Sequence, residues 1–258
     1  MNVSFILLII LFILMTVIGG GRGLKSFFTL FLNFIMLFVM LTLISINLDP
    51  IKVTIVICII ISFITLFFIN GFNIKTISSL LSVTLVVFIT MLITYNIGNS
   101  AKIQGFGNEQ AEAISYLSLY VQLNFGKIVI CEMLIGLLGA VIDVSISISS
   151  SMYEIYKSST FVTRHTIFIS GMNIGKDILG TMTNTLLFAY ISSFMTLLIY
   201  FSETHYTIIS ILNTKVFCSD VFQSLCSGIG IILVIPITAF ITSQILFLKL
   251  PFEQDKAH

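Results

Sequence analysis

Several kinds of residue are scarce in this sequence, and each shortage excludes a class of protein. Only 9% of the 258 residues are charged, whereas soluble domains carry roughly 25%, so the chain has too little polar surface to cover the core of a soluble globule. The formal net charge is +1, which excludes the strongly basic surface that nucleic-acid binding requires. Tryptophan is absent, so any aromatic belt at a membrane surface must be built from tyrosine and phenylalanine.

Cysteine and histidine are too scattered to form a metal centre. The four cysteines are Cys58, Cys131, Cys218 and Cys226. The first two lie in apolar runs and are expected to be small core residues. The last two are eight residues apart and could form a disulfide, but no paired framework is present. His165 and His205 are both expected in loops, away from other ligands. No nucleophile with a base and no phosphate-binding loop is present, so we expect neither an enzyme nor a bound cofactor.

Hydrophobic runs, by contrast, fill the sequence: 57% of the residues are hydrophobic. The runs are near the ~20 residues that a helix needs to cross a bilayer, so the sequence predicts an all-α, polytopic transmembrane helix bundle. About seven spans are expected, at residues 3–19, 26–47, 51–69, 77–97, 127–149, 172–201 and 221–247. The first run has no basic residue before it, so we interpret it as a retained span and not a cleaved leader. A single transmembrane domain over residues 1–258 is the simplest account.

Residues 98–122 are the longest polar segment, and they are expected to form a loop outside the membrane. Within this loop, residues 109–122 could form a short interfacial helix. Lysine and arginine are unevenly divided between the two sides, with eight on the side of the carboxyl terminus and four on the other. Because positive charge gathers in cytoplasmic loops, we expect an outside amino terminus, a cytoplasmic carboxyl terminus and an outside loop at 98–122.

A single polar stripe runs along the predicted fifth span. At helical spacing, one face of residues 132–154 carries Glu132, Gly136, Gly139, Asp143, Ser147, Ser150 and Glu154. The rest of this helix is mostly leucine, isoleucine, valine and methionine. An apolar helix with one polar stripe is typical of a membrane span whose stripe faces protein or water.

Asp143 is the most costly residue in the chain, because a carboxylate deep in a span costs about 2.5–3.5 kcal/mol. It is a candidate for binding a proton or cation, although a structural carboxyl hydrogen-bonded across helices is the alternative. Glu132, three turns away on the same stripe, could extend a relay outward, reach the headgroups or pair with Lys127. Gly136 and Gly139 are small enough to permit close helix contact, and Ser147 is a further contact candidate.

The sixth predicted span has a polar stripe of its own, with Asp177, Thr181 and Asn184. An acid near a helix amino terminus is favoured by the helix dipole, which gives Asp177 a structural alternative. Asn184 is costly in lipid, so it should face the fifth span or a cavity. We therefore regard Asp177 and Asn184 as candidate partners of Asp143, with Thr181 as a helix-contact candidate.

These two stretches resemble a known family. The segments GLLGAVIDVSISISSSMYEI and SGMNIGKDILGTMTNTLLFAYI, with GFGNEQAEA in the outer loop, resemble the YibE/F family of bacterial multi-pass membrane proteins over about residues 100–200. The chain starts directly with a span, as the shorter F-type members do, which implies a bacterial plasma-membrane location and a longer YibE-type partner. Two shorter segments, GAVIDVSISIS and GTMTNTLLFAY, are also similar to the proton-coupled helix pair of resistance–nodulation exporters and Sec motor subunits.

Two functions remain open from the sequence. The leading hypothesis is a permease or ion-coupled transport component, with Asp143 as the charge-binding group, Asp177 and Asn184 as its partners and Glu132 as an outward relay. The rival is a membrane scaffold or complex subunit that transports nothing and whose polar stripe is covered by the YibE-type partner. The lipid bilayer is the other expected partner, no nucleic acid is expected, and the sequence names no transported substrate.

Overall fold

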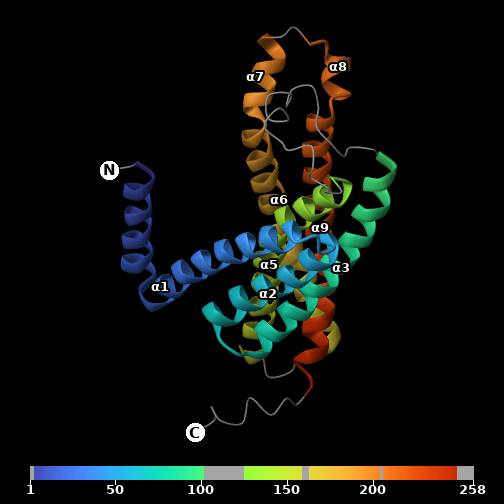
Figure 1. Cartoon of the computed structure of the whole chain (residues 1–258). Helices are drawn as coiled ribbons and strands as arrows, with labels where there is room; N and C mark the ends of the chain where they lie inside the picture. The colour runs from blue at the N-terminus through green and yellow to red at the C-terminus, as the bar shows by residue number, and fades with distance from the viewer. Residues whose placement is uncertain (1–2, 102–124, 159–162, 204–205, 249–258) are drawn as a thin grey trace.

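The computed structural model describes residues 3–101, 125–158, 163–203 and 206–248, and these residues form helices with no strand. The helices are α1 (Val3–Ser45), α2 (Pro50–Asn70), α3 (Ile74–Ala101), α5 (Phe125–Ser158), α6 (Arg164–Ser193), α7 (Met195–Glu203), α8 (Ile208–Leu212) and α9 (Lys215–Ile245) (Figure 1). In this part of the chain, five helices are long and apolar enough to cross a membrane, and α6 with α7 makes a sixth candidate. The predicted all-α polytopic bundle is confirmed. The predicted loop at 98–122 and its interfacial helix lie largely outside the described residues, and residues 98–101 end α3.

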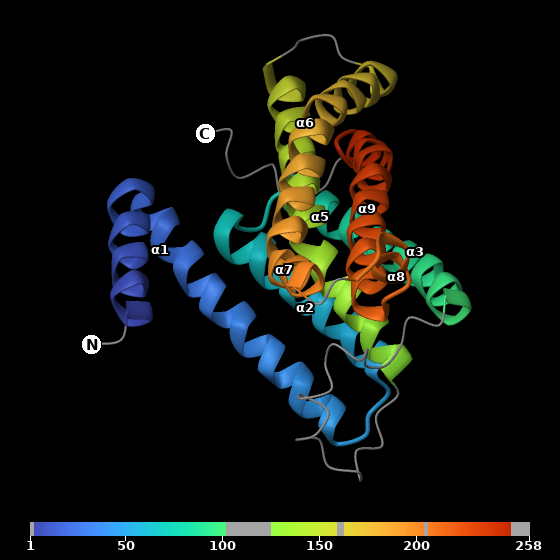
Figure 2. The ribbon, with the colours of Figure 1, turned by 90° about the horizontal axis from the view of Figure 1, so that it is seen from above.

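Helix α1 contains both of the first two predicted spans. Its 43 residues are roughly twice what one membrane crossing needs. A loop was expected around the glycines at 19–23, but the helix continues through them and bends sharply at Gly20, whose φ of 53° and ψ of −136° are not helical. The two arms form a V, and the first arm lies apart from the bundle in both views (Figures 1 and 2). Glycine is the residue that adopts this backbone conformation at little cost.

Helix α5 is the centre of the bundle. It packs against α2, α3, α6 and α9, while α1 packs mainly on α2. One side of α5 is almost completely buried along its length, with Leu134, Leu137, Val141, Val144 and Ile148 all at 0% exposure. The remaining side is the polar stripe predicted from the sequence. Packing of the apolar side of α5 into the core fixes the rotation of this helix. The polar stripe therefore lies on the side that faces away from the core.

Buried hydroxyl groups join α3, α5 and α9. Ser79 Oγ of α3 and Ser149 Oγ of α5 lie 2.6 Å apart. Ser145 of α5 donates to the Ser79 carbonyl at 3.3 Å and accepts from Thr238 of α9 at 3.1 Å. All four side chains are fully buried. Hydrogen bonds between membrane helices of this kind hold neighbours in register.

Helix boundaries differ from the predicted ones chiefly around the fifth and sixth spans. α5 runs to Ser158 instead of ending near residue 149, and α6 begins at Arg164 instead of near residue 172. His165, which was expected in a loop, therefore lies in the first turn of α6. This turn is capped by Thr163, whose side-chain oxygen accepts from the Thr166 amide, as N-cap threonines do. The sixth span is also broken near Phe194, since α6 and α7 meet at an angle of 43°.

Charged and aromatic groups mark the two ends of the bundle. At one end, the ammonium of Lys75 lies over the Tyr153 ring and the guanidinium of Arg164 over the Phe247 ring. At the other end, Lys127 Nζ lies 3.1 Å from Asp49 Oδ1. Cations and aromatic rings at such positions suit the interface between hydrocarbon and water.

Candidate functional site

Two adjoining cavities lie along the exposed side of α5, and each contains one of the predicted acids. The Glu132 cavity has a volume of about 520 Å³ and the Asp143 cavity about 190 Å³. Ile135 of α5 lines both, so they follow one another along the same helix face. Glu132 and Asp143 are both exposed. Eleven residues separate them, which is about 16 Å along a helix axis.

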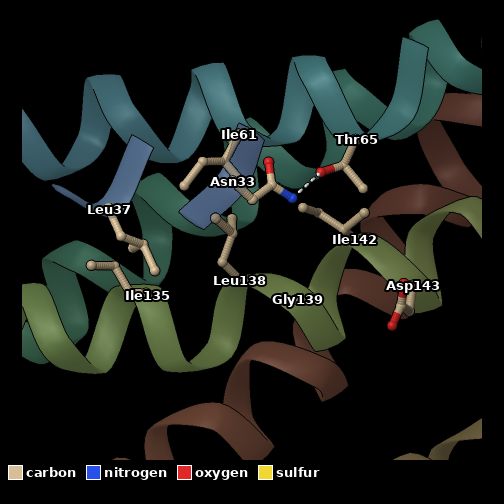
Figure 3. Close-up of a pocket in the computed structure, with 9 residues that line it drawn as sticks. All are labelled: Asn33, Leu37, Ile61, Thr65, Ile135, Leu138, Gly139, Ile142 and Asp143. Carbon is tan, nitrogen blue, oxygen red and sulfur yellow. Dashed lines mark hydrogen bonds between the residues drawn. The ribbon is translucent and has the colours of Figure 1, made fainter. Parts of the chain in front are cut away.

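The Asp143 cavity is enclosed by α1, α2 and α5. Figure 3 shows Asn33 and Thr65 on one side, with the row of α5 residues that ends at Asp143 on the other. Asn33 Nδ2 donates to Thr65 Oγ1 at 3.0 Å, while Asn33 Oδ1 is buried and has no hydrogen-bond partner among the described residues. Most of the other lining residues are apolar. Asp143 and the Asn33–Thr65 pair thus line the same cavity from opposite sides, and Asn33 Oδ1 is itself buried.

The Glu132 cavity is lined by α1, α5 and α9 and is open on one side. Its wall on α1 and most of its α5 surface are apolar. Three polar side chains break this surface: Glu132 of α5, Gln223 of α9 and Ser45 of α1. Glu132 forms no ion pair among the described residues, and Lys127, its suggested partner, pairs with Asp49.

Gly136 lies between the two acids, and side chains of α6 and α9 approach it closely. A Cβ built on Gly136 would lie 2.5 Å from Gln223 Nε2 and 3.2 Å from the Tyr190 hydroxyl. That hydroxyl is 2.8 Å from Ser227 Oγ, which joins α6 to α9. The absence of a side chain at Gly136 thus allows an amide and a phenol to approach the α5 backbone.

The predicted polar stripe of α6 is described but does not meet Asp143. Asp177, Thr181 and Asn184 are all exposed, and none lines either cavity. Thr181 Oγ1 donates to the Ile178 carbonyl of its own helix. Among the described residues no hydrogen bond joins Asp143 to Asp177 or Asn184. Their partnership with Asp143 therefore stays a prediction, although α5 and α6 do pack together.

The two remaining helix-contact candidates on α5 are also on its open side. A Cβ at Gly139 would meet nothing within 4 Å, and Gly139 lines the Asp143 cavity. Ser147 Oγ donates to the Asp143 carbonyl, within α5. Two glycines of α6 make close helix contacts instead: a Cβ at Gly171 would be 2.5 Å from Met152 Sδ, and one at Gly175 would overlap Ile235.

Several residues at this site were not singled out from the sequence, although signals for them exist. Gly171 and Gly175 form a small-xxx-small pattern, which favours close helix packing in membranes. Asn33 is an amide inside a long apolar run, and such a group should find a partner. Gln223, Tyr190 and Ser227 give weaker signals, because polar groups near the end of a span reach water as readily as protein.

No described residues form a group of three or more histidine, cysteine, aspartate or glutamate side chains that could hold a metal ion. All four cysteines are free, so the disulfide considered between Cys218 and Cys226 is not formed. Cys58 and Cys131 are buried, as expected for core residues. The chemistry of the site is therefore that of two carboxyl groups, amides and hydroxyls.

Comparison with known proteins identifies the family. A family model described as YibE/F-like protein matches residues 7–247. The match extends well beyond residues 100–200, where the resemblance in the sequence was most evident. No curated protein and no solved structure matches the chain. With nearly its whole length matched, this apolar, helical chain belongs to the YibE/F family.

Proposed function

We propose that the protein is a permease or ion-coupled transport component of the bacterial plasma membrane. The observation that carries this proposal is the placement of Glu132 and Asp143 on one face of α5, each in its own cavity. Carboxyl groups inside a membrane span are costly and are commonly retained for moving protons or ions. Asp143 binds the coupling ion, and Glu132 receives it nearer the opposite end of the bundle.

The surroundings of the two acids support a path between them. The face of α5 between Glu132 and Asp143 carries Gly136 and Gly139, with the amide of Gln223 and the hydroxyl of Tyr190 beside Gly136. Amide and hydroxyl groups, with water between them, can hand a proton or a small cation along such a face. In this proposal Asp177 and Asn184 meet Asp143 only when α6 moves relative to α5.

Flux measurements in proteoliposomes test the proposal. A proton or cation gradient should drive flux through the wild-type protein, and Asp143→Asn should abolish the coupling while the protein stays folded. Glu154→Gln is the matched control, because Glu154 is an exposed acid of the same helix that lines neither cavity. Full coupled flux through the folded Asp143→Asn variant would show that the assignment is wrong.

The orientation that we propose places the amino terminus outside and the carboxyl terminus in the cytoplasm. Lys75, Lys157 and Arg164 support it, because the end of α5 and the starts of α3 and α6 that carry them lie at the same end of the bundle (Figure 1). Positive charge at one end favours the cytoplasmic side. Labelling of single cysteines at each end with a membrane-impermeant reagent in intact cells tests this orientation.

A second function, a non-transporting subunit of a complex with a longer YibE-type partner, is favoured by a different observation. Asp143, Asp177 and Asn184 are all exposed on the single chain, and such groups are costly against lipid. A partner helix would cover them. Co-purification of the two proteins tests this: binding that is lost in Asp143→Asn or Asn184→Ala, with no flux by the complex, favours the subunit over the transporter. Neither function involves a catalytic step.

A further inference from the structure

The Glu132 cavity has the shape and chemistry of a binding site for one class of ligand. Resting on the proposed transport function, we propose that it binds an amphiphilic organic cation, with the charged centre at Glu132 and the apolar body against α1. Such a cation is then the transported substrate, and the Asp143 cavity serves the coupling ion. The two acids thus have different tasks.

Size is the first argument. The cavity of about 520 Å³ lies within the ~300–1,000 Å³ typical of sites that bind small organic molecules. The Asp143 cavity, at about 190 Å³, falls below that range. An organic substrate therefore fits beside Glu132, whereas a proton or a small inorganic cation suits the space beside Asp143.

The lining is the second argument, because it is mostly apolar. Met40, Leu41 and Ile44 of α1 face Ile128 and Ile135 of α5. Relative to water, a flat or branched hydrocarbon body would gain roughly 25 cal/mol for each Å² of apolar surface that it buries there. The same surface is unfavourable for a sugar, an amino acid or a hydrated ion, since their polar groups would lose water without replacement.

Charge is the third argument, and it selects the sign of the ligand. Among the described residues that line the cavity, Glu132 is the one with a charge, and none is a lysine or arginine. A carboxylate in apolar surroundings is stabilised by a cation brought to it. Gln223 and Ser45 add a carbonyl and a hydroxyl that can accept from an ammonium group. An anionic amphiphile would be repelled, and a lipid tail would leave Glu132 without a counter-charge.

The position of α1 provides a route into the cavity. The cavity lies between α1 and α5, and α1 packs mainly on α2, so the space between α1 and α5 is the route by which a ligand would enter. An amphiphile dissolved in the bilayer would reach the cavity from the side. This is the direction from which apolar cations arrive, because they gather in the membrane interface.

Binding of radiolabelled tetraphenylphosphonium to the purified full-length protein in nanodiscs tests the proposal. Saturable binding of one cation per chain is expected. Glu132→Gln should weaken it at least about tenfold, equivalent to one lost charge contact. Tetraphenylborate, an anion of the same shape, should not compete. Glu154→Gln should bind as the wild type does, because Glu154 lies on the same helix outside the cavity.

A second variant tests whether the ligand needs the space of the cavity as well as the charge of Glu132. Leu41 lines the cavity but is 57% exposed, so Leu41→Trp should fold and should fill the cavity. Its binding of tetraphenylphosphonium should be lost while its melting temperature is unchanged. Equal binding of the cation and the anion, or undiminished cation binding by Glu132→Gln or Leu41→Trp, would overturn the proposal.

The outcome can be distinguished from that of the flux experiment. Asp143→Asn should lose coupling yet still bind tetraphenylphosphonium. If cation binding depends on Glu132 while Asp143→Asn retains full coupled flux, the proposed cation site is supported and the proposed coupling role of Asp143 is wrong. If Asp143→Asn loses flux but no charge-selective binding is found, the substrate class proposed here is wrong.

Discussion

Ser79 and Ser149 are 70 positions apart in the chain, yet their hydroxyl oxygens lie 2.6 Å from each other between α3 and α5. Both hydroxyls also lie near the carbonyl of Lys75, at 2.8 Å and 3.1 Å. This cluster fixes the rotation of α5 relative to α3. It therefore helps to decide which face of α5 carries Glu132 and Asp143 outward.

The hydrogen bond between Ser79 and Ser149 should be measurable in a double-mutant cycle. Replacing both by alanine, singly and together, should give a coupling energy of about 0.6 kcal/mol and no more than about 1.7 kcal/mol, as for other hydrogen bonds between membrane helices. Each serine retains the Lys75 carbonyl when the other is removed, which keeps the coupling modest. Reversible unfolding in mixed micelles measures it. Ser193→Ala, an exposed serine bonded only to its own helix, should show no coupling with Ser149.

Gly175 and Gly180 of α6 should respond in opposite ways to alanine. A Cβ at Gly175 would overlap the β-branched side chain of Ile235 on α9, whereas one at Gly180 meets nothing within 4 Å. Gly175→Ala should destabilise the protein by about 1–3 kcal/mol through overpacking. Gly180→Ala should be neutral or stabilising by up to about 1 kcal/mol, because alanine favours helix. Thermal unfolding in detergent compares the two, and equal stability of both variants would contradict the α6–α9 packing described here.

The bend of α1 should depend on Gly20. Its φ of 53° costs other residues about 1–3 kcal/mol, so Gly20→Ala should straighten α1 or broaden the angle between its arms. Gly19→Ala is the control, since Gly19 has no positive φ and open space around it. Double electron–electron resonance between spin labels at residues 7 and 38 measures the distance between the two arms of α1, and hence the angle between them. An unchanged distance distribution in Gly20→Ala would show that the bend does not need glycine.

Replacing Thr65 should lower the free energy of unfolding more than replacing Asn33. Asn33 donates to Thr65 Oγ1 but leaves its own Oδ1 buried and unpaired. Thr65→Val removes the acceptor, so both Nδ2 and Oδ1 of Asn33 are left without a hydrogen bond. The free energy of unfolding should fall by about 1–3 kcal/mol. Asn33→Leu removes the donor and the unpaired oxygen together, so its cost should be smaller. Parallel unfolding measurements give the order, and a larger loss in Asn33→Leu would mean that Oδ1 has a partner in the membrane.

Much of the fold could be predicted from the sequence because each helix of a membrane protein is specified locally. The long apolar runs identify α2 and α3 within a few residues, and α5 and α9 with one end off by nine and six residues, since length and hydropathy alone decide whether a helix crosses the bilayer. A change of direction near Gly20 was expected between the first two spans, but the continuous helix through it and the break at Phe194 were not predicted. Both depend on how a helix is supported by its neighbours, and hydropathy carries no such information.

The candidate site was predicted only in part, for a comparable reason. Helical spacing placed Glu132 and Asp143 on one face of α5, and that face is indeed the open one. Spacing could not show which helices enclose each acid, or that Asn33, Thr65 and Gln223 line the two cavities.

The sequence by itself determined the membrane environment, the helical class and the polar stripe of α5, because these follow from composition and a 3.6-residue period along one chain. Only the tertiary structure decided what lies opposite the stripe. Buried serines and glycines set the rotation and separation of packed helices, and such contacts join residues far apart in sequence. That is why Asp143 lines one cavity with Asn33 of α1, while Asp177 and Asn184 of α6 are exposed and line neither cavity.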